Sequence, residues 1–331
     1  MRKNKILILP VILVLLLCFT SNAGAVDNTT VDPAWMEKAI NTQGDDKHPP
    51  AELVYEFALA HPSEVLPASK SAYMTKDYNP YLNITTINLD EDKEPEHIMF
   101  IGQNYANTMF YVIKKVNNQW KIIHSEYLWL HNEAPELHLS NTTLKNRTFH
   151  IRYLHERGTG LWLYTYRFYK VINGKTYLTL EIPEEVNLAM YASLINGDAS
   201  LTKIQVDSND DSIYAHYSYE FWPGGQIMSA LHIEEPSEGE PMLLLKQENA
   251  FVSFDWNDKK HKFEVSEPSG NAEADTITLA QFNYFLNLLK IDNDKLFVPA
   301  FKKQLEEVTT SGDEQQKKIA KYLLSHTKTK K

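Results

Sequence analysis

A short acidic segment at residues 88–96 carries the residue types best suited to binding a hard cation. Side chains with oxygen atoms occupy its first, third, fifth and ninth positions, and an apolar run at residues 98–101 follows it. Calcium takes about six to eight oxygen ligands, so side chains spaced in this way could converge on one ion if the backbone wraps around it. The segment is therefore a candidate metal loop that leads into a β-strand.

The segment resembles the calcium loop of the FG-GAP and VCBS repeat families, in which a strand follows the acidic loop, whereas a helix follows the loop of an EF-hand. The resemblance covers residues 88–100, and it implies a calcium ion held by the backbone carbonyl of Glu94 and by the side chains of Asn88, Asp90, Asp92 and Glu96. The sequence departs from the family at the sixth position, where Lys93 replaces the glycine that permits a sharp turn. The alternative is an acidic β-turn that keeps the shape of the loop without its ion.

A second group of possible metal ligands follows further along the chain. Histidines recur there at seven-residue intervals with glutamates between them, and both residue types bind zinc or copper: His124, Glu126, His131, Glu133, Glu136 and His138. Pro135 lies inside this segment, and a spacing of seven aligns side chains on a helix, whereas this stretch follows an expected strand. We therefore expect no transition-metal site here.

The sequence lacks the motifs of the common catalytic sites, including G-x-S-x-G, the phosphate loop G-x-x-x-x-G-K-[ST] and the dinucleotide fingerprint G-x-G-x-x-G. His155 and Glu156 are adjacent, so in a strand they point to opposite faces and make a poor acid/base pair. A glycosidase needs two carboxyl groups at a defined separation in space, which the adjacent Glu184 and Glu185 do not establish. The sequence predicts no catalytic residue and no organic cofactor, and it favours a non-catalytic protein.

Two rows of aromatic residues alternate along expected strands. Trp162, Tyr164, Tyr166 and Phe168 form the first row, and Tyr217, Tyr219 and Phe221 form the second. Such rows could stack on sugars or contact a partner protein, or they could fill the core of a sandwich. We favour the core, with some tyrosine hydroxyls reaching its rim.

The expected secondary structure is mainly β between short helical ends. One helix has Asp32 as its N-cap and Pro33 at its first position, and a second covers residues 50–60 before Pro62. Residues 84–265 are aromatic and β-branched stretches divided by turn residues. Hairpins are expected at three turn pairs, of which the Asn-Gly pair best accepts the positive φ angles of a type I′ turn: Asn117-Asn118, Asn173-Gly174 and Asn257-Asp258.

No βαβ alternation and no fixed repeat period appear, so we predict an antiparallel sandwich or an irregular propeller-like set of sheets. The expected organisation is a signal peptide at residues 1–25, an N-terminal helical segment at 26–80, an antiparallel β domain at 81–267 and a C-terminal helical segment at 268–331. The C-terminal segment should hold helices at residues 278–290, 300–308 and 313–325, with Pro299 and Gly312 between them.

The first residues indicate export. Arg2, Lys3 and Lys5 precede an apolar stretch at residues 6–19 and the small residues 23–25, which is the pattern of a cleaved signal peptide. The apolar stretch is shorter than the about 20 residues that span a bilayer, so we expect no membrane span after cleavage. The one cysteine, Cys18, lies in this segment, and a mature chain without disulfides favours a bacterial protein that is periplasmic or extracellular. A net charge of −10 argues against nucleic-acid binding.

Three functions fit these observations. The leading hypothesis is an exported non-catalytic binding or envelope-associated protein of unknown ligand, braced by calcium at residues 88–96. The second is a hydrolase acting on polysaccharide or peptide through an unrecognised carboxylate or histidine site. The third is a structural accessory module whose C-terminal helices bind an envelope partner.

Overall fold

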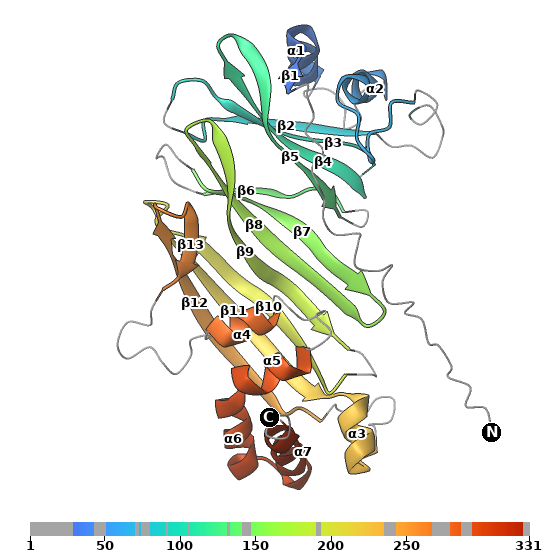
Figure 1. The fold of residues 1–331 in the computed structure, drawn as a ribbon, viewed down its shortest axis with the longest axis vertical. Coiled ribbons are helices and arrows are strands. Elements are labelled where there is room, and N and C mark those ends of the chain that lie inside the picture. Colours follow the sequence, from blue (N-terminus) through green and yellow to red (C-terminus); the bar gives the residue numbers. More distant parts are fainter. Residues whose placement is uncertain are drawn as a thin grey trace, which may run out of the picture.

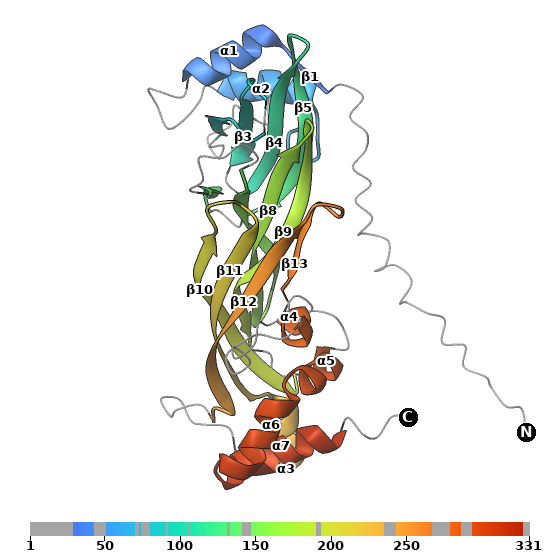
Figure 2. The same cartoon turned by 90° about the vertical axis from the view of Figure 1, so that its left-hand side faces the viewer.

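The computed structural model describes residues 29–42, 51–69, 73, 80–90, 92–104, 106–130, 133–140, 147–189, 193–234, 243–266, 279–285 and 293–326. The expected signal peptide therefore lies outside the described residues. The chain forms two antiparallel sheets with helices at both ends (Figure 1), which confirms the predicted mainly β fold. The sheets follow one another along the long axis of an elongated molecule (Figure 2).

The first sheet has five strands in the order β1-β5-β4-β3-β2: β1 (Thr30–Val31), β2 (Tyr81–Ile87), β3 (Glu96–Asn104), β4 (Asn107–Val116) and β5 (Gln119–Trp129). Strands β2 to β5 form a meander, and β1 joins it by pairing Thr30 with Lys121. The turn from β4 to β5 has φ angles of 51° at Asn117 and 62° at Asn118, as the predicted hairpin requires.

Two helices, α1 (Pro33–Asn41) and α2 (Ala51–Ala60), cover one face of the first sheet and confirm the two helices expected near the N-terminus. Asp32 caps α1 by accepting a hydrogen bond of 2.9 Å from the backbone nitrogen of Trp35. The Trp35 indole donates to the carbonyl of Leu53 at 2.9 Å, which joins the helices. Together they bury apolar side chains against the sheet, among them Met36, Phe57, Met99, Tyr111 and Ile113.

In the second sheet, each of the eight strands pairs with its neighbour in sequence: β6 (Leu137–Leu139), β7 (Phe149–Gly158), β8 (Leu161–Ile172), β9 (Lys175–Leu188), β10 (Ile195–Val206), β11 (Ser212–Pro223), β12 (Lys246–Asn257) and β13 (Lys262–Val265). The β8–β9 turn has φ angles of 52° at Asn173 and 72° at Gly174. This confirms the Asn-Gly hairpin, and β12 and β13 confirm the third predicted hairpin. A short helix, α3 (Gly225–Leu231), follows β11.

Four C-terminal helices pack against the second sheet (Figure 2): α4 (Leu279–Phe285), α5 (Asn293–Ala300), α6 (Lys302–Ser311) and α7 (Glu314–His326). Pro299 lies in the last turn of α5, so the following helix begins at Lys302 and not at the expected residue 300. Gly312 separates α6 from α7, as expected. None of the helices in the described ranges is long and apolar enough to span a bilayer.

One of the three buried apolar clusters among the described residues contains side chains of both sheets. Phe100 and Phe110 of the first sheet pack in the same buried cluster as Phe149 and Tyr169 of the second. The rings of Phe149 and Tyr169 stack with their centroids 5.3 Å apart, and Phe110 contacts both. The two sheets therefore meet over part of their faces in the manner of a sandwich.

A buried aspartate fastens the turn between β10 and β11 to the start of β7. Asp210 has a φ of 58° and a side chain that is 2% exposed. Its Oδ2 atom accepts hydrogen bonds from the backbone nitrogen of Thr148 at 2.9 Å and from the hydroxyl of Ser140 at 3.2 Å. The ammonium of Lys170 donates to the carbonyl oxygen of Asp210 at 2.8 Å, so this one residue holds three other segments in place.

Candidate functional sites

The acidic loop lies between β2 and β3 and is held by its own side chains. Asp90 Oδ1 accepts from the backbone nitrogen of Asp92 at 3.0 Å, and Asp92 Oδ1 accepts from that of Glu94 at 2.9 Å. Glu96 Oε2 accepts from the backbone nitrogen of Leu89 at 2.7 Å, which closes the loop. Lys93 is not among the described residues with positive φ, so position 93 does not have the left-handed conformation that glycine would favour.

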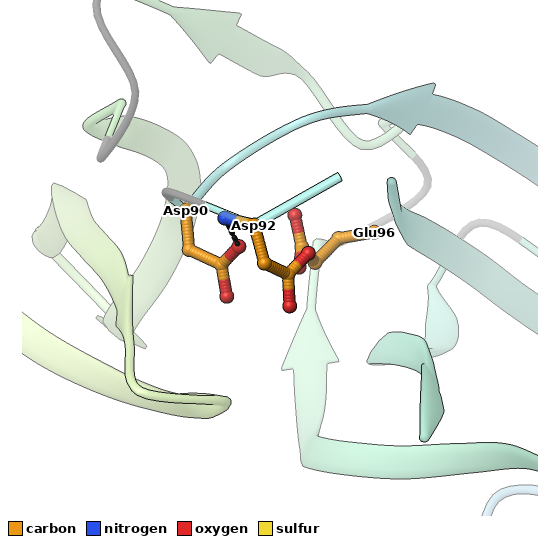
Figure 3. A group of neighbouring side chains, drawn as sticks. All are labelled: Asp90, Asp92 and Glu96. Atoms are coloured by element: carbon orange, nitrogen blue, oxygen red, sulfur yellow. Dashed lines mark hydrogen bonds between the residues drawn. The ribbon is translucent and has the colours of Figure 1, made fainter. Parts of the chain in front are cut away.

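This geometry brings together three of the five predicted ligands. Ligand oxygens of Asp90, Asp92 and Glu96 lie within 4.8 Å of one another, and Figure 3 shows the three carboxylates on the same side of the loop. These residues, called the acidic triad below, could hold a metal ion. The amide nitrogen of Asn88 donates a hydrogen bond to the backbone carbonyl of Asp92 at 2.8 Å and is therefore not a metal ligand.

A lysine that the sequence analysis missed lies among the triad. Strand β4 places Lys114 directly opposite Glu96 in the β3–β4 register. The Lys114 Nζ atom lies 2.5 Å from Asp90 Oδ2 and 2.9 Å from Asp92 Oδ2, and it also contacts Glu96 Oε1. The side chains of Lys114, Asp90 and Glu96 are at most 7% exposed, whereas Asp92 is 53% exposed.

The electrostatics of the loop follow from these contacts. Burial alone would lower the pKa of Lys114, but its bonds to the three carboxylates outweigh burial and raise that pKa above its ordinary value. The hydrogen bond from Lys114 lowers the pKa of Asp92, whereas burial raises the pKa of Glu96. At neutral pH Lys114 therefore stays charged, and its ammonium is a cation inside the acidic loop.

Two of the three histidines of this segment fall within the described residues, and each has a different partner. His124 Nε2 lies 3.3 Å from Glu126 Oε2, whereas His138 stacks on His150 of the neighbouring strand with centroids 4.8 Å apart. His131 lies outside the described residues. Within the described ranges, His124 and His138 thus have different partners, and they are not part of a cluster of metal-binding side chains.

Two arginines of the second sheet each bind a group of carboxylates. Arg152 contacts Glu133, donates to Glu184 at 2.9 Å and to Glu185 at 3.4 Å, and its guanidinium lies 3.8 Å from the centroid of the Tyr164 ring. Arg167 forms a second such centre with Glu126 and Glu181. For Glu181, burial alone would raise the pKa, but bonds from His155 and Arg167 outweigh it and lower the pKa to about 2.

One face of the second sheet carries a continuous row of polar and aromatic side chains. Register partners in neighbouring strands lie on the same face. One row of such partners crosses β7 to β12 in the order Arg157, Trp162, Asn187, Asp198, Glu220 and Gln247. A second row, two positions along each strand, contains Tyr164, Glu185, Ser200, Ser218 and Asn249. We call these two rows the polar face.

The polar face is opposite the helices. The intervening row of register partners, Leu163, Val186, Ala199 and Tyr219, belongs to the buried core that also contains Phe297 and Phe301 of the C-terminal helices. On the polar face Trp162 is 38% exposed, and its indole donates to Glu185 at 3.1 Å. Arg157, Ser200, Gln247 and Asn249 are exposed as well.

The two predicted aromatic rows have different roles. Tyr217, Tyr219 and Phe221 are at most 3% exposed and lie in the core, as favoured from the sequence. Phe168 is fully buried, and Tyr164 is 8% exposed beneath Arg152. Of these seven residues, Trp162 is the one with a large exposed surface.

Acid is expected to destabilise the fold through His150, which is 7% exposed between His138 and Phe168. Burial, and then the proximity of His138, lower the pKa of His150 from 6.5 to about 3. The unfolded chain therefore binds a proton below its ordinary pKa that the folded chain does not bind, and stability falls as the pH drops through 6.5 toward 3. The loss is about 1.4 kcal/mol per pH unit.

The measurement is the free energy of unfolding at pH 7 and pH 5 for the parent chain and for His150→Phe. The variant should lose about 2 kcal/mol less than the parent over this interval. His216→Gln, at an exposed position of β11, is the control and should follow the parent. Equal pH dependence in His150→Phe and the parent would show that His150 does not carry the effect.

Comparisons of the chain with protein-family models, with curated proteins and with solved structures found no match.

Proposed function

We propose that this chain is an exported, non-catalytic binding protein that holds a basic segment of an envelope partner against its polar face. The observation that carries the proposal is the row of side chains that crosses six strands with an exposed tryptophan in it. Export rests on the sequence pattern of residues 1–25.

Two neighbouring carboxylates of the polar face favour a positively charged ligand. Asp198 and Glu220 are direct register partners, and like charges placed opposite each other in neighbouring strands are destabilising. Burial, and after it the nearby carboxylates of Glu220 and Glu185, raise the pKa of Asp198, although Asn187 donates a hydrogen bond to it. A lysine or arginine of a partner would relieve this repulsion.

The neighbouring cations of the chain do not supply that charge. Arg157 is on β7, three strands away from Asp198 on β10. Arg152 is already bound to three glutamates. The exposed ring of Trp162 adds a surface on which a cationic side chain can lie. A basic polypeptide segment therefore complements the polar face through its positive charge and through contact with the Trp162 ring.

A hydrolase has less support. A glycosidase or acid protease needs a carboxyl group with a raised pKa beside a second free carboxylate. Asp198 beside Glu220 comes nearest to such a pair, but Asp198 already accepts a hydrogen bond from Asn187. The glutamates around Arg152 and Arg167 are bound by these arginines. The cleft of about 500 Å³ between α1 and α2 contains Asp32 and Glu56. Both carboxylates already have partners, because Asp32 caps α1 and Glu56 pairs with Lys38 at 3.1 Å.

A docking role for the C-terminal helices has less support as well, because Tyr284 of α4 is 2% exposed and packs in the core.

Calcium, which the resemblance of the acidic loop implies, is not part of the proposal. The ammonium of Lys114 already contacts the three carboxylates that the ion would need.

The proposal is tested with a fluorescent lysine-rich peptide, a glutamate-rich peptide of the same length and a neutral oligosaccharide, by anisotropy or calorimetry. The lysine-rich peptide should bind, more weakly as salt increases. Trp162→Ala should weaken binding by about 5- to 10-fold, the size of a cation–π contact. Asp198→Asn combined with Glu220→Gln should weaken it and reduce its dependence on salt.

Trp129→Ala is the matched control, because Trp129 is 37% exposed but lies on the first sheet. It should bind the lysine-rich peptide like the parent chain. Binding of the oligosaccharide alone, sensitive to Trp162→Ala, would keep the polar face as the binding surface but contradict the basic ligand. Equal effects of the two tryptophan substitutions would contradict the surface itself.

A further inference from the structure

We propose that the ammonium of Lys114 is the resident cation of the acidic loop and takes the place of the calcium ion that the FG-GAP-like sequence implies. The proposal is independent of the polar face. It rests on two observations. The ligand pattern of residues 88–96 fits a metal ion, but the side chain of Lys114 on β4 contacts the carboxylates that would bind this ion.

The ammonium and a calcium ion exclude each other from the triad. Calcium lies about 2.3–2.6 Å from its oxygen ligands. The Lys114 Nζ atom lies 2.5 Å from Asp90 Oδ2 and 2.9 Å from Asp92 Oδ2, so it occupies the position that such an ion would need. Two cations so close would also repel each other strongly in a buried site.

The fold fixes the lysine in this position. Lys114 and Glu96 are register partners, so the pairing of β3 with β4 places the ammonium beside the loop. The Lys114 side chain is 4% exposed, and a buried lysine remains charged when carboxylates surround it. The lysine thus neutralises one of the three negative charges and joins the loop to the sheet, as a bound ion would.

The same geometry contains a latent metal site. If the charge of Lys114 is removed, the three carboxylates of the triad still converge. The Oδ1 atom of Asn88 is buried, and among the residues that the structure describes it has no hydrogen-bond partner. It is the remaining side-chain oxygen of the ligand set that the sequence resemblance implies. We therefore infer that Lys114→Met, which keeps an unbranched apolar stem but lacks the ammonium, converts the loop into a calcium-dependent one.

The test is the melting temperature of the chain from residue 26 onward, in chelator and in millimolar calcium, magnesium or matched sodium salt. The parent chain should melt at the same temperature in all four. Lys114→Met should melt lower in chelator and regain several degrees in calcium but not in magnesium, which demands a stricter geometry. Adding Asp92→Asn should abolish the regain.

Lys115→Met is the matched control, because the Lys115 ammonium lies 5.6 Å above the ring of Trp120 and not in the loop. It should show no calcium effect. A calcium-specific rise in the parent chain that Asp90→Asn removes would overturn the proposal, because calcium would then be the resident ion. A Lys114→Met variant that folds without any response to calcium would overturn the latent site.

A second measurement covers the case in which Lys114→Met does not fold. Acetylation of the native parent chain, read by mass spectrometry, should modify the exposed Lys93 and leave Lys114 unmodified, with or without calcium. Acetylation of Lys114 that increases in calcium would show that the ion displaces the ammonium, and this result would contradict the proposal.

Discussion

Replacing Arg167 by methionine is expected to lower the free energy of unfolding by about 3–5 kcal/mol, the cost of removing one partner from a buried ion pair. Arg167 on β8 donates to Glu181 at 3.0 Å and contacts Glu126 on β5, so it links the two sheets. Its guanidinium also lies 3.5 Å from the centroid of the Tyr153 ring. Without it, two carboxylates that are at most 23% exposed keep their charges and lose their cation.

Chemical denaturation of the parent and the variant measures this loss, and further variants test its cause. Glu126→Gln with Glu181→Gln, added to Arg167→Met, should recover part of the stability because no unpaired charge remains. Arg167→Lys should be more stable than Arg167→Met but less stable than the parent chain, because an ammonium cannot reproduce the planar fork of a guanidinium.

Lys38→Met is the control for Arg167→Met. It breaks an ion pair whose side chains are 60% and 46% exposed, and it should cost less than about 1 kcal/mol. A similar small loss in Arg167→Met would contradict the structural role of the arginine.

Replacing Asp210 by alanine is expected to cost about 3 kcal/mol, because three groups lose their partner or their charge balance at once. The backbone nitrogen of Thr148 and the hydroxyl of Ser140 would lose their acceptor. The buried ammonium of Lys170 would lose the nearby carboxylate. Alanine also accepts a φ of 58° less readily than aspartate does.

Two neighbouring variants separate these causes, with the free energy of unfolding as the measurement. Asp210→Asn keeps an oxygen acceptor and tolerates the left-handed conformation, so it should retain more stability than the alanine variant. Asp211→Ala changes an exposed side chain of the same turn and should cost less than about 0.5 kcal/mol. Equal losses at positions 210 and 211 would show that the turn matters and the carboxylate does not.

Local signals in the sequence predicted part of the fold, although β1, α3 and α5 were not expected. The cap at Asp32 and the Asn-Gly pair at residues 173–174 act within a few residues of chain, and the structure contains both. The division of the strands into two sheets was not predictable in this way. It depends on which faces of distant strands meet, as when Phe110 packs against Phe149.

The acidic triad was predictable because its residues are close in sequence and their spacing follows a known kind of loop. Lys114 was not predicted because it lies 24 positions from Asp90. It comes to lie beside Glu96 through the pairing of β3 with β4, and the hairpin that closes at Asn104 and Asn107 was not among those predicted. The polar face has no local signal either, since Trp162, Asn187 and Asp198 become neighbours through strand register alone.

The position of β1 has a consequence for the order in which the chain assembles. Strands β2 to β5, and β6 to β13, each pair with the next strand in sequence, so they can form by local pairing as the chain becomes available. Thr30, in contrast, pairs with Lys121, and all of α1, α2, β2, β3 and β4 lies between them. The first strand in the sequence is therefore expected to be the last one placed in the first sheet, after β5 has formed.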